Sequence, residues 1–388
     1  MKFLFLITTL FCLSTFAAGN FKVAAFNIKQ FGPTKAGNPI VMAQLTTLIK
    51  DYDVVLIQEV RDVSESAPSA LLNSINNAVT GAPFSMLITL PLGRSTYKEQ
   101  YVLFYRHDKL TLKPSSQIIA GWYVYDDGIE PNDTFMREPL IAHFQSLDTN
   151  LDFVVIGAHI DPDTNQPSRT IAELDELFFV QLNALTTFGD NDILMMGDFN
   201  ADCSYLSDTE EAQLLLKINS GFHWLIDKTA DTTVRASTHC AYDRFIASDS
   251  FFSKLVPNSV HIQNFQTTLG LANEAEALAV SDHYPIELDI QNENTTGINS
   301  QGEDKKITLY PNPLLKNQNI HILLGESAIG NELEVQIFNI SGKRLLNISV
   351  NAFERKIILS TENFPKGQYF MKGIDKLGLT FIKSFTIF

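Results

Sequence analysis

The chain has 388 residues, of which 45% are hydrophobic and 19% are charged. This composition is too apolar for a disordered chain and too mixed for a fibre, and the length predicts two domains. Acidic residues outnumber basic ones by 44 to 29, and within residues 19–301 by 36 to 17, a net charge of −19 there. A globally basic nucleic-acid binder is therefore excluded, so a polyanionic substrate would have to be held by metal ions and a few local cations.

The N-terminus reads MKFLFLITTLFCLSTFAAGN. One lysine precedes an apolar run, and small residues follow at Ala17 and Ala18, which predicts a secretory signal peptide over residues 1–18. A membrane anchor, the alternative, needs about 20 apolar residues, and this run is shorter and interrupted by polar ones. No other stretch of the sequence could span a bilayer, so we expect an exported protein with no stable membrane span.

After the signal peptide, strand-like apolar runs repeatedly end in polar residues. FKVAAFN ends at Asn27, DVVLIQE at Glu59, FVVIGAH at His159, and DILMMGDFN at Asp198 and Asn200. A hydrophobic strand that ends in a carboxylate, an imidazole or an amide allows a rigid sheet to present an active site. Five such residues in one chain predict a site where strand ends converge.

This polar set combines oxygen donors with two imidazoles, His159 and His283. Oxygen ligands suit hard divalent cations such as Mg²⁺, Mn²⁺ or Ca²⁺, and the lack of thiolates argues against zinc. The imidazoles can take and give protons near neutral pH. Together they predict metal-assisted hydrolysis of a phosphodiester or phosphomonoester. The oxygen donors are Asn27, Glu59, Asp198, Asn200 and Asp282.

Four motifs resemble the secreted deoxyribonuclease I branch of the endonuclease/exonuclease/phosphatase superfamily. They occupy residues 95–106, 196–205 (MGDFNADCSY), 239–245 (HCAYDRF) and 279–285 (AVSDHYP). The resemblance covers about residues 21–290, and we therefore assign residues 19–290 to a nuclease domain. It implies an α/β (α+β) fold, a four-layer α/β/β/α sandwich in which two mixed sheets pack face to face and helices cover each. Apolar residues at helical spacing predict two of these helices, over residues 41–50 and 170–185.

The resemblance also implies catalytic roles. His159 would pair with Glu99, and His283 with Asp243, each carboxylate orienting its imidazole. We expect His283 to activate the attacking water as the base and His159 to protonate the departing 3′ oxygen; in a competing scheme, Asp198 is the base and the histidines bind phosphate. The alternative to a catalytic role is that some of these groups only satisfy buried backbone.

The same resemblance implies a metal site. Glu59, helped by Asp282 and Asn27, would hold a catalytic Mg²⁺ or Mn²⁺. Asp198 and Asn200 would position phosphate, water or a second ion.

DNA contacts are implied at a few cationic and aromatic residues. Arg61 and Tyr97 match residues that reach into the minor groove, where contacts read groove width with weak sequence selectivity. Arg137 also lies in a matched motif. Lys29 stands where the family has arginine, which makes a phosphate contact there a weaker expectation.

Structural calcium sites are implied in two loops, and ordinary polar turns are the alternative for both. The first loop is two residues shorter than that of the family and lacks its small disulfide, while the second carries one extra residue. The first would use Asp127, Asp133, Phe135 and Glu138, and the second Asp231, Thr233 and Thr238.

The mature chain keeps two cysteines, Cys203 and Cys240. In an exported protein they can form a disulfide, and free buried thiols are the alternative. The resemblance implies that they form the larger disulfide of the family.

The C-terminal part changes in character. Residues 291–305 are polar and contain glycine, which predicts a linker, and the short alternating runs of residues 306–388 predict a small β-sandwich. The YPNP, SGK and GQY motifs beginning at residues 310, 341 and 367 resemble the C-terminal sorting domain of type IX secretion. A generic adhesion or carbohydrate-binding module is the alternative.

The sequence thus predicts a secreted or surface-attached, monomeric, divalent-metal-dependent endonuclease. Its substrate would be double-stranded DNA, its products 5′-phosphorylated oligonucleotides, and its partner the type IX secretion machinery. A phosphatase or sphingomyelinase of the same superfamily and a non-enzymatic surface binder are the alternatives.

Overall fold

The protein is described here from a computed structural model. The predicted signal peptide and all but the first two residues of the predicted linker lie outside the described residues. No helix within the described ranges is long and apolar enough to cross a membrane. The described ranges are 19–128, 133–163, 168–219, 221–292, 308–311, 314–316, 318–323, 332–339, 343–351, 356–375 and 380–387.

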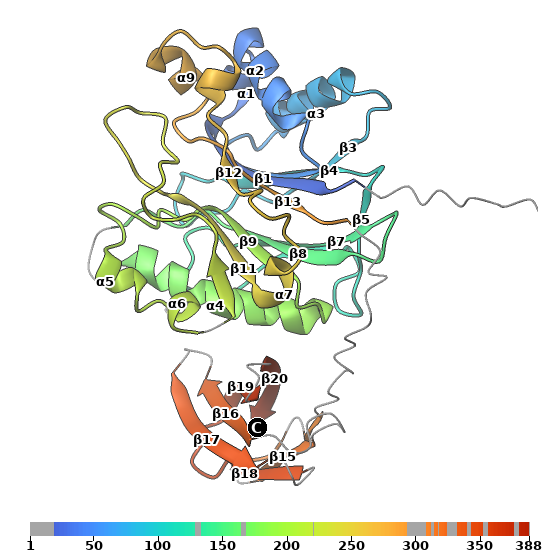
Figure 1. The fold of residues 1–388 in the computed structure, drawn as a ribbon, viewed down its shortest axis with the longest axis vertical. Coiled ribbons are helices and arrows are strands. Elements are labelled where there is room, and N and C mark those ends of the chain that lie inside the picture. Colours follow the sequence, from blue (N-terminus) through green and yellow to red (C-terminus); the bar gives the residue numbers. More distant parts are fainter. Residues whose placement is uncertain are drawn as a thin grey trace, which may run out of the picture.

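Two mixed β-sheets form the centre of the larger domain (Figure 1). The first sheet has six strands, and β1 and β2 run parallel at its centre. These two strands are almost wholly buried, which explains why they read as continuous apolar runs instead of alternating ones. In spatial order the strands are β12 (His261–Ile262), β13 (Ile286–Ile290), β1 (Phe21–Phe31), β2 (Val54–Val60), β4 (Gln100–Arg106) and β3 (Phe84–Ile88).

The second sheet packs against the first, and its central strands β8 and β9 are also parallel. The two strands of a parallel pair run in the same direction, so their carboxyl ends lie at the same edge of the sheet. This holds for β1 and β2 in the first sheet and for β8 and β9 in the second. In spatial order the strands are β10 (Phe222–Trp224), β11 (Asp243–Ser248), β9 (Ile193–Asp198), β8 (Asp152–Gly157), β7 (Leu140–Ser146) and β5 (Leu110–Leu112), with β6 (Trp122–Val124) also paired to β7.

Helices cover the outer faces of both sheets, which confirms the expected four-layer sandwich (Figure 1). The predicted helix over 41–50 is α2, which begins at Pro39 after the Asn38 side chain caps two backbone amides. The helix predicted over 170–185 is α4, which ends at a left-handed Gly189. The first sheet carries α1 (Pro33–Ala36), α2 (Pro39–Ile49), α3 (Ser66–Ala78), α8 (Phe265–Thr268) and α9 (Glu274–Val280); the second carries α4 (Arg169–Phe188), α5 (Asp208–Glu211) and α6 (Leu215–Ile218), and the short α7 (Asp249–Phe252) follows β11.

A side chain of β2 packs directly on the backbone of β8. A Cβ atom on Gly157 would lie 2.8 Å from both terminal methyl carbons of Leu56, so the leucine side chain occupies the space that a side chain on β8 would need. Leu56 is fully buried in the cluster between the sheets. This contact fixes the spacing of the sheets near their functional edge.

The first and the last strand of the larger domain are neighbours. β1 pairs antiparallel with β13, from Phe21 opposite Ile290 to Ala25 opposite Ile286. The N-terminal strand is therefore central, and its partner comes from the other end of the domain.

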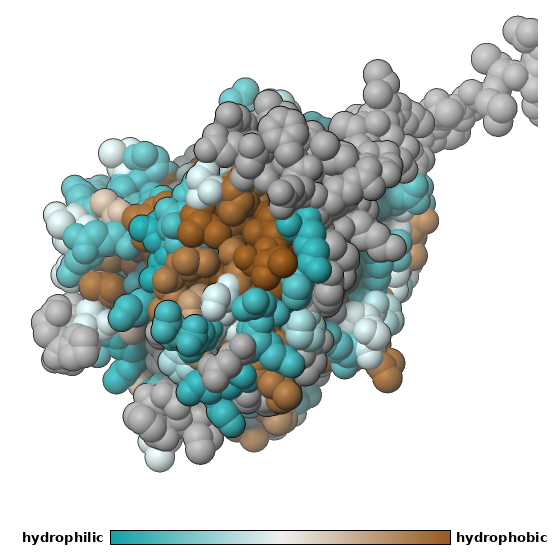
Figure 2. All heavy atoms as spheres, turned by 90° about the horizontal axis from the view of Figure 1, so that it is seen from below, coloured by the Kyte–Doolittle hydropathy of each residue, from teal (hydrophilic) through white to brown (hydrophobic). Residues whose placement is uncertain are grey.

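A separate β-rich unit follows, as predicted, with its own hydrophobic core. Its sheets flank that core, and Phe370 of β19 also lies against Phe179 of α4, with ring centroids 6.2 Å apart. Seen from this end of the molecule, the surface has a hydrophobic area bordered by hydrophilic residues (Figure 2). One sheet contains β14 (Thr308–Tyr310), β15 (Asn319–Leu323) and β18 (Lys356–Ser360); the other contains β17 (Arg344–Asn351), β16 (Glu332–Asn339), β19 (Gly367–Asp375) and β20 (Thr380–Ile387).

We expect Leu56→Ala to lower the free energy of unfolding of the larger domain by about 2–5 kcal/mol, because it leaves a cavity between the sheets. The measurement is urea unfolding followed by intrinsic fluorescence. Leu90→Ala is the control, since this side chain of the same domain is 80% exposed and its loss should cost less than about 0.5 kcal/mol. Equal effects of the two substitutions would contradict the assigned packing.

Candidate active site

Strand ends from both sheets meet around one amide. Asn27, in β1, donates from Nδ2 to Glu59 Oε1 at 2.9 Å and to Asp198 Oδ2 at 3.0 Å. Glu59 belongs to β2 of the same sheet, whereas Asp198 ends β9 of the other sheet. The facing sheets therefore place two carboxylates on either side of the same nitrogen.

One histidine–carboxylate pair lies beside this cluster. His159, just beyond the end of β8, places Nδ1 2.7 Å from Glu99 Oε2. Its Nε2 atom lies 3.5 Å from Asp198 Oδ2. Both residues of the pair are buried, so the ring is held between two acidic groups.

A second pair approaches from the other side. His283 Nδ1 lies 2.8 Å from Asp243 Oδ2, and His283 Nε2 lies 3.6 Å from Asp198 Oδ2. Asp243, at the start of β11, is fully buried. Both imidazoles thus present Nε2 to the same carboxylate oxygen, with a second carboxylate behind each ring.

Each imidazole lies between two carboxylates, and this arrangement shifts the pKa values of the site. Burial opposes ionisation of Glu99, but His159 and Arg137 outweigh it and lower the Glu99 pKa to about 2. Burial also disfavours a charged His283, but Asp243 and Asp198 outweigh it and raise the pKa of His283 to about 10. Burial and Arg137 oppose protonation of His159, and Glu99 and Asp198 still raise its pKa. Burial raises the Asp243 pKa although His283 acts in the opposite direction.

Two further residues hold His159 by its backbone. The hydroxyl of Tyr101 accepts a hydrogen bond from the His159 N–H at 2.8 Å, and Arg137 Nε donates to the His159 carbonyl at 3.1 Å. Arg137 is only 6% exposed, and its Nη2 atom has no hydrogen-bond partner among the described residues. This buried guanidinium therefore lies next to the first pair, 3.6 Å from Glu99.

Sequence patterns do not reveal Glu173, a buried carboxylate on α4. It accepts backbone hydrogen bonds from Met136 at 2.7 Å and Asp161 at 2.8 Å, and so joins the loops that carry Arg137 and follow His159. Burial raises the pKa of Glu173 to about 7. Within the sequence it is one polar residue in an apolar helix pattern, and its partners are backbone groups that leave no trace in residue spacing.

The remaining metal-ligand candidates lie around this centre. The Asn200 N–H donates to Asp198 Oδ1 at 3.1 Å, and its side-chain amide donates to the Ile160 carbonyl at 2.9 Å. Asp282 forms an ion pair with Lys29 at 2.5 Å. Lys29 was expected to contact DNA, but here its amine neutralises a candidate metal ligand.

Arg61 and Tyr97 form a pair at the rim of the central cluster, where the Tyr97 side chain contacts Glu99. The guanidinium carbon of Arg61 lies 3.8 Å from the centroid of the Tyr97 ring, and Tyr97 is 40% exposed. A stacked cation and ring on the surface can contact a nucleic acid without rearrangement of either side chain.

The second predicted calcium loop adjoins the central cluster, because Thr233 forms a β-bridge with His283. In both loops, other groups contact the acids. Asp133 contacts Arg94, and Asp127 accepts hydrogen bonds from the backbone of Thr134 and Phe135. Burial raises the pKa of Glu138, and Asp133 and Asp127 add to this effect.

In the second loop, Asp231 accepts from Thr233 and lies 2.8 Å from His239, while the Thr233 hydroxyl donates to the carbonyl of Thr238. The predicted calcium ligands of this loop therefore contact one another, and Asp231 also contacts the imidazole of His239.

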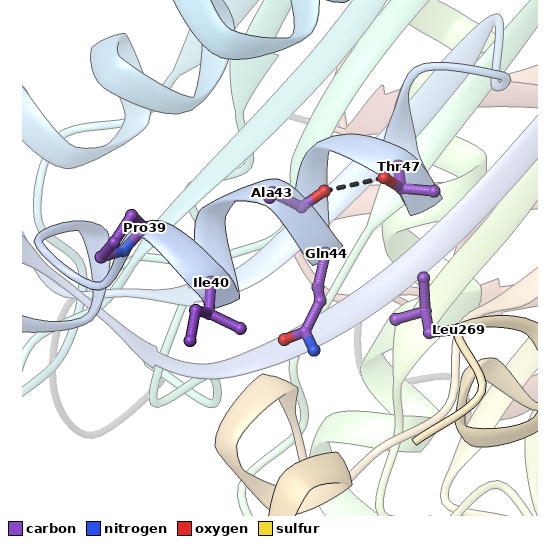
Figure 3. A pocket seen from close by; sticks show the side chains of 6 residues that line it. All are labelled: Pro39, Ile40, Ala43, Gln44, Thr47 and Leu269. Carbon is purple, nitrogen blue, oxygen red and sulfur yellow. Dashed lines mark hydrogen bonds between the residues drawn. The ribbon is translucent and has the colours of Figure 1, made fainter. Parts of the chain in front are cut away.

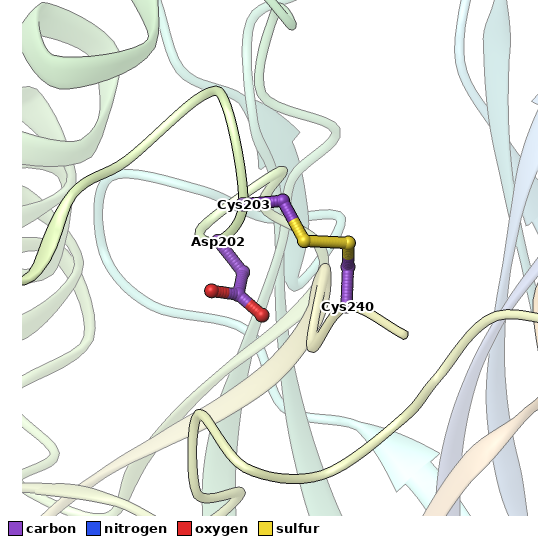
Figure 4. Close-up of side chains that lie close together, drawn as sticks. All are labelled: Asp202, Cys203 and Cys240. Carbon is purple, nitrogen blue, oxygen red and sulfur yellow. A yellow bond between two sulfur atoms is a disulfide. The ribbon is translucent and has the colours of Figure 1, made fainter. Parts of the chain in front are cut away.

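The two cysteines form a disulfide between the loop after β9 and the loop before β11, with Cα atoms 5.9 Å apart (Figure 4). The adjacent Asp202 accepts a hydrogen bond from the backbone of Ala241 at 2.8 Å, which joins the same loops a second time. The bridge between Cys203 and Cys240 therefore holds the loop of Asn200 to the strand of Asp243.

A surface hollow on the outer helices lies away from these groups. It is lined by Pro39, Ile40, Ala43, Gln44 and Thr47 of α2 and by Leu269 (Figure 3). The Thr47 hydroxyl already donates to the Ala43 carbonyl, and no ionisable side chain lines the hollow. Its chemistry does not suit catalysis.

Comparison with known proteins gives two family matches. Residues 24–283 match the endonuclease/exonuclease/phosphatase family, and residues 308–387 match the secretion system C-terminal sorting domain. The chain is 40% identical to deoxyribonuclease-1 of Oryctolagus cuniculus over 275 residues, which covers 70% of this chain and 92% of the rabbit protein. It is 41% identical to deoxyribonuclease-1 of Sus scrofa over 274 residues, 70% and 91% of the two chains.

Among solved structures, an endonuclease/exonuclease/phosphatase from Bacteroides vulgatus matches with a TM-score of 0.50. Its sequence identity is 18%, and the match covers 70% of this chain and 99% of that one. At this identity the likeness concerns the fold alone.

The lowered pKa of Glu99 predicts a pH dependence of stability. Because this pKa falls from 4.5 in the unfolded chain to about 2 in the fold, the carboxylate stabilises the fold above about pH 4.5, and this contribution is lost as the pH falls towards 2. Between about pH 6 and pH 3, the urea midpoint of Glu99→Gln should therefore fall less than that of the unsubstituted protein. The exposed Glu362→Gln is the control and should follow the unsubstituted protein. An equally steep fall for Glu99→Gln would contradict the assigned ion pair.

Proposed function

Because the chain belongs to the endonuclease/exonuclease/phosphatase family and is a deoxyribonuclease, we propose that it hydrolyses double-stranded DNA to 5′-phosphorylated oligonucleotides with the help of a divalent cation. The observation that carries the proposal is the convergence of His159 and His283 on one carboxylate oxygen of Asp198. Such a pocket can bind a phosphate between two imidazolium groups and move protons on either side of it.

The donor set fits a hard cation. Glu59 and Asp198 share a single amide donor, and a Mg²⁺ or Mn²⁺ ion is held by carboxylate and amide oxygens of this kind. We assign the ion to Glu59, with Asp282 and Asn27, and we assign phosphate or water positioning to Asp198 and Asn200. When bound, the cation supplies positive charge for the oxygens of the scissile phosphate.

Proton transfer falls to the two pairs. In one scheme His283 takes the proton of water and His159 donates one to the 3′ oxygen. In the other, Asp198 is the base and both imidazoles bind phosphate. The raised pKa of His283 favours the second scheme, because a base must be unprotonated near neutral pH. The raised pKa of His159 fits both schemes, since the first one uses this imidazole as the proton donor.

DNA binding rests on few side chains, since the domain is acidic overall. We assign minor-groove contact to the exposed pair of Arg61 and Tyr97. Lys29 and Arg137 are assigned to phosphates at the site; Arg137 Nη2 is a buried donor without a hydrogen-bond partner among the described residues. These contacts position the duplex and select weakly among sequences.

Calcium would act by ordering loops. We assign structural or activating Ca²⁺ sites to the two loops described above. To bind the ion, Asp133 would have to release Arg94, and Asp231 would have to release His239.

The match to a sorting domain indicates an exported protein that is secreted or held at the cell surface. We assign export to the signal peptide over residues 1–18, domain boundaries to 19–290, 291–305 and 306–388, and targeting to the type IX machinery. The enzyme is proposed to act as a monomer.

A phosphatase or sphingomyelinase-type phosphodiesterase of the same family remains the second candidate, because both chemistries use the same pairs and metal ligands. The exposed Arg61–Tyr97 stack favours DNA, since a small ester has no need of it. The non-enzymatic binder is set aside, because the chain is an enzyme.

We expect supercoiled plasmid to be nicked by the full chain in Mg²⁺ and Ca²⁺, and a chelator to abolish the nicking. His159→Ala and His283→Ala should each lower the rate by about 10²–10⁴-fold, because each removes a proton donor or phosphate ligand. The exposed His107→Ala is the control and should keep the unsubstituted rate. Nicking that survives the chelator or both active-site substitutions would refute the proposal.

Replacing Arg61 and Tyr97 together by alanine should weaken duplex DNA cleavage by about tenfold or more at moderate salt, mainly through KM. Hydrolysis of bis(p-nitrophenyl) phosphate should fall less than plasmid cleavage, because a small ester loses only the support that Tyr97 gives to Glu99 and not the contacts with the duplex. Lys217→Ala is the control, since Lys217 also stacks on a ring, that of Trp224 at 4.3 Å, outside the site. Unchanged plasmid cleavage in the double variant would favour the phosphatase or sphingomyelinase alternative.

A further inference from the structure

We propose that Gln58 is a positioning residue for the nuclease reaction, because its carboxamide is inserted between β8 and β9 where His159 and Asp198 leave the sheet. The inference rests on the proposed function and adds a residue that touches neither DNA nor the reacting phosphate. Gln58 is fully buried in β2, in the opposite sheet.

The ladder of hydrogen bonds between β8 and β9 lacks one bond at this point. Ala158 N–H donates to Met196 at 3.1 Å, and Ile160 N–H donates to Asp198 at 3.0 Å. In a regular parallel ladder, the bond between these two would run from Asp198 N–H to the Ala158 carbonyl.

The side chain of Gln58 takes the place of that missing bond. Asp198 N–H donates to Gln58 Oε1 at 3.0 Å, and Gln58 Nε2 donates to the Ala158 carbonyl at 2.7 Å. The carboxamide therefore bridges the two strands as an additional peptide group would, and the strands are held apart by its width.

Gly197 makes room for this arrangement. Its φ is +140°, a value that L side chains rarely adopt, and a Cβ atom there would lie 2.1 Å from the Ala158 carbonyl and 2.8 Å from Gln58 Nε2. The glycine of the GDFN motif is thus required by its positive φ and by the Ala158 carbonyl, and the Gln58 amide occupies the space beside it.

The backbone of the neighbouring residue allows Gln58 to reach the site. Successive residues of a strand normally point to opposite faces. Here, however, the Glu59 side chain accepts from Asn27, while the Gln58 side chain accepts from the backbone of Asp198, to which Asn27 also donates. Glu59 has φ of +58°, and the register of β2 against β1 shifts there. This irregularity brings both neighbouring side chains to one region.

The bridge acts on both groups that face the phosphate. The peptide between Ala158 and His159 is held at its oxygen by Gln58 and at its N–H by the Tyr101 hydroxyl. The same carboxamide holds the backbone of Asp198. Gln58 therefore sets the position of His159 relative to Asp198, and a neutral amide does so without adding another charge to an acidic cluster.

Only a group with one donor and one acceptor can complete this bridge. Methionine has nearly the same length but supplies neither, so in Gln58→Met the strands lose both bonds. Because a shift of about 1 Å at a catalytic group can cost about 100-fold in rate, we expect kcat to fall about 10–100-fold. KM should stay within about twofold, since no DNA contact is removed.

Steady-state cleavage of supercoiled plasmid in Mg²⁺ and Ca²⁺ by the full chain tests this, with thermal unfolding to establish the folded fraction. Asn76→Leu is the matched control: the Asn76 carboxamide also uses its donor and its acceptor on backbone groups, the carbonyl and the N–H of Phe84 at 3.0 and 2.8 Å, but it joins α3 to β3 outside the site. Its kcat should remain within about twofold.

If Gln58→Met fails to fold, Gln58→Glu replaces it, because it keeps the acceptor for Asp198 and loses the donor to Ala158; kcat should again fall with KM unchanged. Retained kcat in a folded Gln58 variant, or equal losses in the Gln58 and Asn76 variants, would overturn the inference. If the unsubstituted protein does not cleave DNA, the proposed function fails instead, so the two failures are distinguishable.

Discussion

The site depends on one carboxylate oxygen, Asp198 Oδ2, on which an amide and two imidazoles from different parts of the chain converge. Asn27 approaches to 3.0 Å, and the Nε2 atoms of His159 and His283 to 3.5 and 3.6 Å. A buried carboxylate is costly unless neighbouring donors compensate its lost hydration. The charges therefore alternate outwards from Asp198 through each imidazole to a further carboxylate, which allows several acids to occupy a small buried volume.

Site residues could be predicted from the sequence wherever a polar residue ends an apolar strand. Asn27, Glu59 and Asp198 could be found because strand ends meet at a sheet edge, and the four-layer fold followed from the motifs that surround them. Tyr101 and Glu173 could not be found in this way. They act through backbone N–H and carbonyl groups of distant segments, and such contacts depend on how loops approach one another rather than on residue spacing.

Charge is distributed unevenly between the nuclease domain as a whole and the edge of the sheets that holds the active site. The domain is strongly acidic, so long-range attraction of DNA is weak, and binding depends on short-range contacts from few cations. Lys29 already neutralises Asp282, and Arg137 lies beside Glu99, which leaves Arg61 stacked on Tyr97 at the surface. Cations close to the pocket thus balance its acids, whereas the exposed pair is available to the duplex.

The pairing of β1 with β13 has a consequence for the order of events during synthesis and export. Phe21 emerges from the ribosome first, yet its antiparallel neighbour Ile290 emerges some 270 residues later. The central sheet therefore stays incomplete while most of the domain is being made, and the chain can be threaded across a membrane before it closes. Once β13 has docked, the sheet is complete without any strand from the C-terminal unit.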